Sequence, residues 1–498
     1  MRRFKLNNLL IIFSISLFFC VISMDNASQI NMDYTFSTFN VNSHDFTKSS
    51  TDIIKDSKRK IMDNTIQINP NDPGGIKGAI NNNYGCIVLT EGEYTGENNT
   101  DIIIDRSITI KGSKSSGIVI NAEGKSGIIT INSNGNLTLS SVTLSNGNSE
   151  TGGGVCNIDG SFTIDSCVFD NNIGRLMGGA IFSRTTKKLN LITNTLFKNN
   201  NGNMSGGAVF SFGDNTTSII KNCNFLHNNA SNIYGGAGSI MVLGYNNLIL
   251  ENSNISESSG FNGGGIVVSG DEALYNQGIK AKINISNTII SNNTAYVWGA
   301  GLYSKYNDVD IKNTTFINNK LLPYVLEETE YYNGGGYYNL NGNVHISNST
   351  FENNFGYHGG GLDTRYGNFD IKNSIFKNNN AVYGGGVYSN SGNITLSNST
   401  LSNNSVSVNG GGIYNLNGSS TIDNCNISSN VAGDNGGGLD ARYGSCNINN
   451  SLISHNSGRD GAGAYVHFGN LNITSSNVSD NIGEYGAGLC CEDGNLNL

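Results

Sequence analysis

The sequence repeats one unit many times. A glycine-rich triplet (GGG, GGA or GAG) recurs from residue 152 onward, and most neighbouring triplets begin 25 to 29 residues apart. A fixed period of this length is typical of a solenoid, in which each unit buries its apolar face only against its neighbours. The triplets begin at Gly152, Gly178, Gly206, Gly235, Gly263, Gly299, Gly334, Gly359, Gly384, Gly410, Gly436, Gly461 and Gly486.

A second anchor accompanies the triplets. An aromatic or aliphatic residue is followed three positions later by asparagine, except that Ile255 is followed by Ser258. Stacked asparagines can hydrogen-bond one coil to the next at a turn, because an amide both donates and accepts. The pairs are Phe169/Asn172, Phe197/Asn200, Phe225/Asn228, Ile290/Asn293, Phe316/Asn319, Phe351/Asn354, Phe376/Asn379, Leu401/Asn404, Ile427/Asn430, Ile453/Asn456 and Val478/Asn481.

Between the anchors run short stretches such as NITLSNST and FDIKNSIF, which alternate with a period of two and are rich in β-branched residues. Leucine-rich and ankyrin-type units need helix formers, which these stretches lack. We therefore expect an all-β fold, a right-handed parallel β-helix with coils of about 25 residues stacked about 4.8 Å apart. Glycines allow the tight corners with positive φ.

The chain divides by composition. Arg2, Arg3 and Lys5 precede an apolar run over residues 9–22, which predicts a signal peptide, with an uncleaved anchor as the alternative. The segment 74–83 is a short helix candidate whose Ile76 and Ile80 would cover the first coil. The expected divisions are a signal peptide (1–24), a polar leader (25–63), the N-terminal cap and first coils (64–150) and the repeat β-helix (151–498).

The last unit stops before its second anchor, so we expect an exposed strand edge there that pairs with a continuation or a partner. The net charge is -9 with no basic run beyond the N-terminus, which excludes nucleic acid and anionic membranes as partners. The eight cysteines after the signal form no disulfide framework and no CxxC, so they are expected to be small buried residues, with disulfides of an exported protein as the alternative. No histidine or cysteine cluster and no phosphate loop is present, and neither a metal nor another cofactor is predicted.

An aromatic row is the first candidate binding feature. Two residues after a triplet stands an aromatic in most units, and the residue before it is mostly aliphatic. Alternation therefore places these rings on the outer side of the sheet, where they could stack against sugar rings or partner side chains. A ladder that only stabilises coil stacking is the alternative. The candidate ligand-binding residues of this row, with the neighbouring tryptophan, are Trp298, Tyr303, Tyr338, Tyr388 and Tyr414.

Two related motifs, LDTRYGN and LDARYGS, carry the acids and bases most suited to chemistry. They place Asp363 with Arg365, and Asp440 with Arg442, and we include all four among the candidate ligand-binding residues. The motifs are three repeats apart, which puts the carboxylates about 14 Å apart along the axis, too far for one glycosidase pair. His358 adds a titratable group beside the first motif. The alternative is a pair of duplicated Asp–Arg surface contacts, so no catalytic residue is predicted.

Two intervals are longer because of insertions, at residues 271–282 and 320–332. A solenoid accepts extra residues only at corners, so both insertions should leave the rod. The second is expected to be a loop near the aromatic row that contributes to ligand binding. A neutral insertion is the alternative. Its candidate residues are Tyr324, Glu327, Glu328 and Glu330.

The paired signals GGAIF or GGAVF and FxxN resemble the repeats of the chlamydial polymorphic membrane proteins. The Asn- and Thr-rich filling resembles adhesin-like surface proteins of methanogenic archaea, and the order of the first strands is similar to pectin-lyase-like β-helices. These resemblances imply a secreted or cell-surface, non-catalytic adhesin-like protein that binds extracellular glycans or proteins. A carbohydrate-active enzyme, either a pectate-lyase-like polysaccharide lyase or a glycoside hydrolase, is the alternative because β-helices often carry such sites.

Overall fold

The computed structural model describes residues 64–230, 232, 236–323 and 333–498. The described residues all belong to one compact unit, Met62–Leu498. The predicted signal peptide (1–24) and leader (25–63) lie outside the described residues. So do the candidate loop residues Tyr324, Glu327, Glu328 and Glu330.

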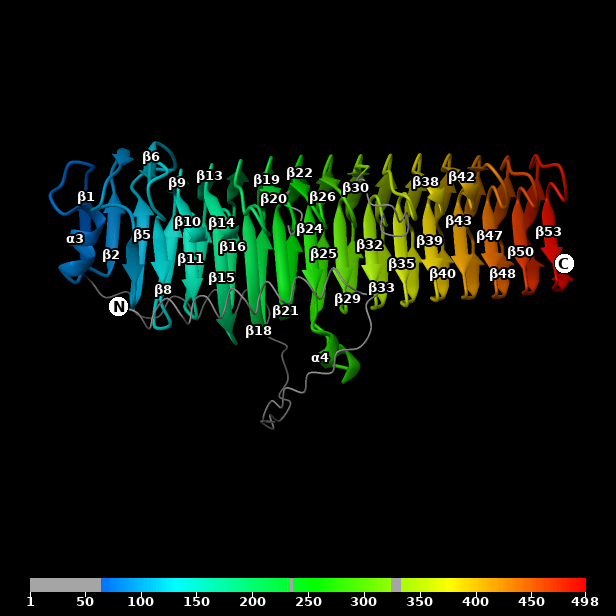
Figure 1. Cartoon of the computed structure of the whole chain (residues 1–498), viewed down its shortest axis with the longest axis horizontal. Coiled ribbons are helices and arrows are strands. Elements are labelled where there is room, and N and C mark those ends of the chain that lie inside the picture. Colours follow the sequence, from blue (N-terminus) through cyan, green and yellow to red (C-terminus); the bar gives the residue numbers. More distant parts are fainter. Residues whose placement is uncertain (1–63, 231, 233–235, 324–332) are drawn as a thin grey trace. The chain divides into compact units, whose positions relative to one another are not determined.

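The described unit is the predicted parallel β-helix (Figure 1). One of its sheets contains fifteen strands in chain order, from β3 (Gly92–Tyr94) to β52 (Asn477–Ser479), and contributes one strand to each coil in the described part of the chain. The coils are about 26 residues long. Neighbouring coils pair in parallel register, since Phe351 opposes Phe376 and Phe376 opposes Leu401. Each repeat is therefore one coil.

A representative coil contains four short strands. They are β39 (Val387–Asn390), β40 (Ile394–Ser397), β41 (Thr400–Ser402) and β42 (Ser405–Asn409). The next coil repeats them as β43 (Ile413–Leu416), β44 (Ser420–Asp423), β45 (Asn426–Ser428) and β46 (Val431–Ala432). Alternation along each strand sends Val387, Ile394 and Leu396 into one hydrophobic core that runs through the coils.

The first strand of each coil follows the glycine triplet and matters most for the site. These strands are β11 (Val155–Ile158), β15 (Ile181–Thr186), β18 (Val209–Lys221), β21 (Ile240–Glu251), β24 (Ile266–Ser269), β28 (Leu302–Lys305), β32 (Tyr337–Leu340), β35 (Leu362–Arg365), β39, β43, β47 (Leu439–Arg442), β50 (Ala464–His467) and β53 (Leu489–Glu492). β18 and β21 are longer because each continues through the next corner without a break.

Two helices lie at the margins of the coil stack. Helix α3 (Gly75–Asn81) buries Ile76 and Ile80, as the sequence predicted, beside β1 (Thr65–Ile68) and β2 (Cys86–Leu89) at the N-terminal end of the β-helix (Figure 1). Helix α4 (Glu272–Asn276) forms in the insertion at 271–282, buries none of its residues and projects from the edge of the coils. In the described residues no helix is both long and apolar enough to cross a membrane.

Aromatic rings stack along the core. Phe169 and Phe197 have ring centroids 4.9 Å apart, and Phe351 and Phe376 have centroids 4.7 Å apart, with nearly parallel planes. Parallel in-register pairing forces this arrangement, because identical positions on adjacent coils lie one above the other. Such a pair contributes about 0.5–1.5 kcal/mol beyond the burial of its surface. The eight cysteines of the described chain are free, and five are buried.

The predicted asparagine ladder is present and links three coils at each position. The side-chain amide of Asn379 donates to the carbonyl of Phe351 on the preceding coil (2.9 Å) and to Asn404 Oδ1 on the next (3.0 Å). The same Oδ1 accepts from the backbone N–H of Asn379 (3.0 Å). Where Ser258 interrupts the row, its backbone N–H still donates to Asn293 Oδ1. The ladder thus satisfies backbone groups that the turn would otherwise bury unpaired.

This arrangement predicts a large effect of breaking the ladder. Asn404→Ala should lower the free energy of unfolding by about 1–3 kcal/mol, because it leaves the backbone N–H of Asn379 and one of the two side-chain amide N–H donors of Asn379 without an acceptor. Urea unfolding followed by circular dichroism measures the loss. Asn284→Ala is the control, since the Asn284 side chain is exposed and makes no hydrogen bond among the described residues. Equal stability of the two variants would contradict a structural role for the ladder.

Candidate functional site

The candidate site is a row of side chains on the outer face of the strands that follow the triplets. Parallel register aligns one residue per coil: Tyr338 opposes Asp363, Asp363 opposes Tyr388, and Tyr414 opposes Asp440. Their aliphatic neighbours belong to the core on the other face. The row reads Cys156, Phe182, Phe210, Met241, Val267, Tyr303, Tyr338, Asp363, Tyr388, Tyr414, Asp440, Tyr465 and Cys490.

The expected exposure of these aromatics is wrong. Tyr303, Tyr338, Tyr388 and Tyr414 face away from the core, but only 2% to 7% of their surface is exposed. The residues before the triplets account for part of this burial. The ring of His358 lies 4.7 Å from that of Tyr388, measured between centroids. The buried tyrosines are therefore part of the packing and do not form an open platform.

A glycine corner makes this packing possible. Gly384 has φ +63°, and a Cβ there would lie 2.7 Å from the Cβ of Tyr388. The chain therefore turns sharply between Tyr383 and β39, and the Tyr383 ring comes to lie 5.7 Å from that of Tyr414. A side chain at Gly384 would force the corner open.

The outer rings also stack on one another. Tyr303 and Tyr338 have centroids 5.4 Å apart, as do Tyr388 and Tyr414. Trp298, which lies before a triplet, packs at 5.0 Å against Tyr303. These distances are those of a stabilising aromatic ladder, which is the alternative that the sequence left open.

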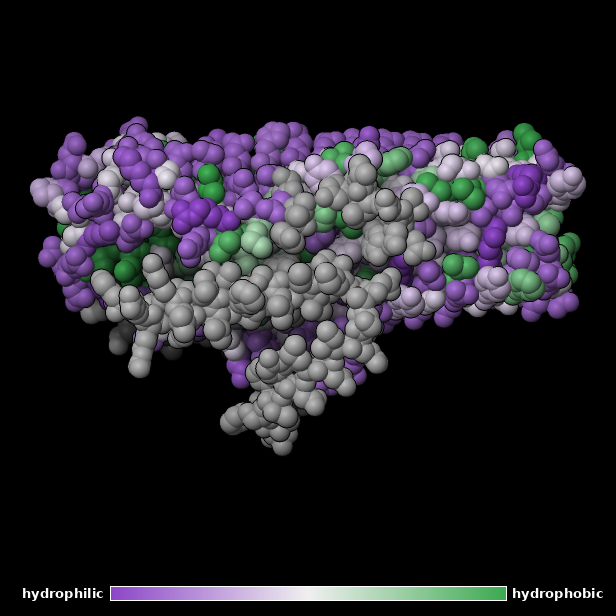
Figure 2. Space-filling view, in the orientation of Figure 1, coloured by the Kyte–Doolittle hydropathy of each residue, from purple (hydrophilic) through white to green (hydrophobic). Residues whose placement is uncertain are grey.

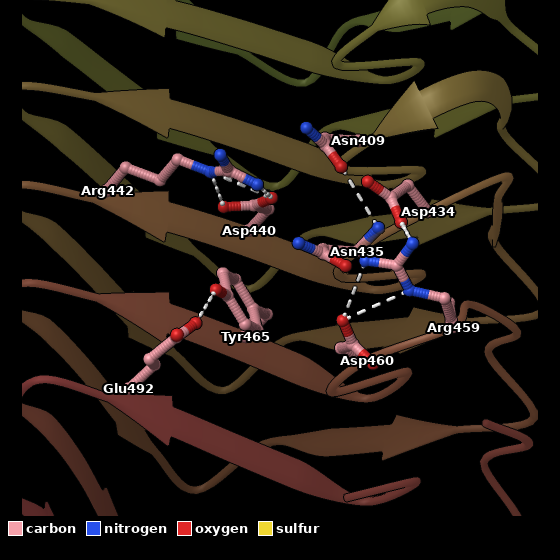
Figure 3. Close-up of polar contacts among 9 residues, drawn as sticks. All are labelled: Asn409, Asp434, Asn435, Asp440, Arg442, Arg459, Asp460, Tyr465 and Glu492. Carbon is pink, nitrogen blue, oxygen red and sulfur yellow. Dashed lines mark hydrogen bonds and ion pairs between the residues drawn. The ribbon is translucent and has the colours of Figure 1, made fainter. Parts of the chain in front are cut away.

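The two acidic motifs take different geometries. Asp440 is fully buried and forms a bidentate pair with Arg442: Nε to Oδ1 is 3.0 Å and Nη2 to Oδ2 is 3.0 Å (Figure 3). Burial raises the pKa of Asp440 to about 7, and Arg442 opposes that shift. The guanidinium lies between the rings of Tyr414 (5.8 Å) and Tyr465 (5.5 Å). The expected Asp–Arg pair therefore exists here, but its carboxylate lies inside the protein surface.

Asp363 has no such partner. It is fully buried, and neither carboxylate oxygen accepts a hydrogen bond. Arg365 turns away and donates from Nη2 to Asn333 Oδ1 (2.8 Å), with His358 Nδ1 at 3.3 Å. Burial raises the pKa of Asp363 to about 7 and lowers that of His358 to about 3. Asp363 thus stays largely protonated into the neutral range, and His358 is a neutral hydrogen-bonding group.

The corner residue explains the difference between the motifs. His358 stands directly before the triplet that precedes the first motif. His358 bonds to Asn333, and Arg365 donates to Asn333 Oδ1 at this corner instead of pairing with Asp363. The equivalent residue before the triplet of the second motif is Asn435, whose amide oxygen can accept from Arg442 Nη2 (3.2 Å) while Arg442 keeps its bidentate pair with Asp440. The register also confirms that the two aspartates are three coils apart, so they do not form one acid pair.

Exposed aromatics occur directly after the last residue of β35, β47 and β50, which is an arginine in the first two and His467 in the third; the sequence interpretation missed them as a feature. Tyr366, Tyr443 and Phe468 are 59%, 56% and 48% exposed. All three have positive φ (55° to 58°), a region that costs a bulky residue about 1 kcal/mol. Other coils place Asn341 or Asn417 here, which tolerate it. The signal was an aromatic–glycine dipeptide (YG, FG) at a position where other coils have NG, SG or DG.

The coil register also brings together one group of possible metal ligands in the described residues: His467, Glu492 and Asp493. Their ligand atoms lie within 4.8 Å of one another. Sequence reasoning missed this group because the histidine and the acids are on different coils.

The surface around the row is mixed. Where grey atoms do not hide the face shown in Figure 2, the C-terminal half is largely hydrophilic, with hydrophobic residues in small separate groups. At the corner, Arg459 pairs with Asp434 (2.8 Å) and Asp460 (3.0 Å), close to the Asp440–Arg442 pair in Figure 3. The exposed rings are therefore set among charged and amide groups.

Comparison with known proteins supports the fold. Residues 240–427 match the family described as "Right handed beta helix region", which confirms the predicted handedness. No curated protein matches the sequence.

Three solved structures are similar to the chain at 9–12% identity. Bacteriophage CBA120 tailspike protein 3 has 9% identity and a TM-score of 0.31, over 80% of this chain and 56% of that one, so the chain spans little more than half of the tailspike. The A-module of the mannuronan C-5 epimerase AlgE6 of Azotobacter vinelandii has 12% identity and a TM-score of 0.26, over 84% and 93%. The catalytic domain of a GH87 alpha-1,3-glucanase has 10% identity and a TM-score of 0.24, over 87% and 68%. None of these similarities bears on function.

The unpaired carboxyl predicts a pH dependence. The pKa of Asp363 is raised to about 7 in the folded protein, and an unfolded aspartate titrates near 3.9. Between these values the folded state binds more protons, so stability falls as pH rises. Asp363→Asn should reduce this loss of stability. The free energy of unfolding of the variant, relative to that of the wild type, should therefore increase from about pH 4.5 to about pH 8. Thermal unfolding across this range measures it.

Asp310→Asn is the matched control, because Asp310 lies on an exposed outer face of β29 (Asp308–Lys312). It should leave the slope unchanged. If Asp363→Asn and Asp310→Asn give the same pH profile, the buried carboxyl does not titrate as described.

Proposed function

We propose that the protein is a secreted or cell-surface rod that binds an extended glycan, without catalysis, along its exposed aromatic positions. The observation that carries this proposal is the strained, exposed pair Tyr443 and Phe468, whose rings stack at 5.3 Å on adjacent coils. A bulky residue with positive φ persists only where the surrounding structure or a function requires it. Exposed aromatic faces bind apolar faces of ligands such as sugar rings.

A fixed cation supports this binding surface. Arg442 precedes Tyr443 and is held by the bidentate pair with Asp440, so little rotamer entropy is lost when it donates further hydrogen bonds. Its side chain remains 23% exposed. Arg365 and Tyr366 repeat the combination three coils away, about 14 Å along the axis. An extended polymer that follows the axis could contact both places.

This proposal keeps some of the ligand-binding residues that the sequence predicted. The arginines of both motifs remain candidate ligand contacts. The buried tyrosines and Trp298 support the surface from beneath, and the aspartates hold or neighbour the arginines. Tyr366, Tyr443 and Phe468 take the contacting role instead.

A carbohydrate-active enzyme is the second candidate, and the protonated, unpaired Asp363 favours it. A perturbed carboxyl beside Arg365 and His358 is the kind of group that acts as a general acid. However, a general acid must come within hydrogen-bond reach of its substrate, and Asp363 has no exposed surface. For this reason we favour binding over catalysis.

The binding proposal predicts the effect of removing the exposed rings. Tyr443→Asn and Phe468→Asn should each weaken binding to a glycan about 3- to 10-fold, since an aromatic contact contributes about 0.5–1.5 kcal/mol. Asparagine suits the backbone here, because Asn417 has the same conformation on a neighbouring coil. A glycan array identifies ligands, and titration of the strongest measures affinity.

Tyr485→Asn is the control, because Tyr485 is 67% exposed but lies outside this row. Asn417→Tyr should strengthen binding by adding a ring beside Tyr443. The proposal is wrong if the row variants bind as the wild type does or if the control loses as much affinity.

Catalysis is tested separately. The purified protein should release no products from a panel of polysaccharides, including uronic-acid polymers. Turnover by the wild type that is lost in Asp363→Asn and kept in Asp310→Asn would establish the enzyme instead.

A further inference from the structure

His467, Glu492 and Asp493 come together on the last two coils through register alone. His467 ends β50, and its partner in β53 is Glu492. Asp493 follows directly, with φ +52°. The Nε2 atom of His467 lies 3.6 Å from Asp493 Oδ2.

The chemistry of this group suits a divalent metal. Zn²⁺ takes imidazole nitrogen and carboxylate oxygen ligands at about 2.0–2.2 Å, which places ligands of a tetrahedral site about 3.3 Å apart. The 3.6 Å separation is close to that value, and all three ligand atoms lie within 4.8 Å. We propose that these residues form a binding site for a divalent transition-metal ion such as Zn²⁺, with a fourth position open to solvent. The imidazole nitrogen favours Zn²⁺ and other transition metals over calcium, which prefers six or more oxygen ligands.

The ligands are held in place by their neighbours. The ring of His467 stacks on that of Phe468 at 4.0 Å, which limits its rotation. Tyr465 donates from its hydroxyl to Glu492 Oε2, and Figure 3 shows the tyrosine directed at that carboxylate. Such second contacts orient metal ligands and strengthen binding.

The nearby positive charge is already neutralised. Arg442 is the register partner of His467 on the preceding coil, and a free guanidinium there would repel a cation. Its bidentate pair with Asp440 removes that repulsion at short range. Because the charge of Arg442 is offset by Asp440, the carboxylates of Glu492 and Asp493 leave the site with a net negative charge.

Other histidine–acid contacts lack part of this set. His455 lies 4.0 Å from Asp480 without a second acid, and His345 approaches Asp370, a carboxylate that Lys372 already contacts at 2.8 Å. Among the described residues only the His467 group offers three ligands. The proposal does not rest on the binding of glycans.

The test is calorimetric titration of the full chain with zinc sulfate after dialysis against EDTA. The wild type should bind one Zn²⁺ per chain at this site. His467→Ala and Asp493→Asn should each weaken that binding at least tenfold, because each removes one of three ligands. His455→Ala, which removes an exposed histidine next to a single acid, should leave it unchanged. Circular dichroism establishes that each variant is folded, and Asp493→Asn suits the backbone because asparagine adopts this conformation on other coils.

Three outcomes would overturn the proposal: no saturable zinc binding by the wild type, undiminished binding by both site variants, or an equal loss in His455→Ala. Repeating the titration with calcium chloride tests the metal class. Calcium bound as tightly as zinc, with no effect of His467→Ala, would mean that exposed carboxylates bind cations without the histidine.

Discussion

The buried asparagine ladder is the interaction on which the rest of the structure depends. Each amide joins its own turn to the coil before it and the coil after it, as Asn379 does with Phe351 and Asn404. The turn has few other partners for its buried N–H groups, so the amide must sit at one height and one register. Once this position is constrained, every other residue of the coil stacks on its equivalent.

Register in turn decides what the outer face can do. Equivalent positions on successive coils stack on one another whatever the chemistry of their side chains. The glycine corner then packs the residue before each triplet against this row. Tyr388 is buried for this reason although it faces away from the core. The exposed aromatic side chains lie at the edge of the row, where Tyr443 and Phe468 occupy strained positions.

Two motifs of nearly the same sequence show that local sequence alone does not determine side-chain pairing. LDTRYGN and LDARYGS share the aspartate, the arginine and the exposed tyrosine, but only Asp440 is paired. The difference arises in residues outside the motifs, His358 and Asn333, which attract Arg365 across the corner. Burial raises the pKa of both carboxyls to about 7, and the two sites differ in geometry and in hydrogen bonding.

The sequence by itself determined the repeat, the strands, the parallel stacking and the asparagine ladder, because each is a local pattern that every coil must satisfy. It also placed Asp363 and Asp440 three coils apart and identified the aromatic row. Only the tertiary structure decided that Tyr303 and Tyr338 are buried, that Arg365 leaves Asp363, and that His467 meets Glu492 and Asp493. These outcomes depend on side-chain contacts across corners and between coils. The sequence period specifies which positions are equivalent, but it does not specify which side chain packs against a neighbouring coil.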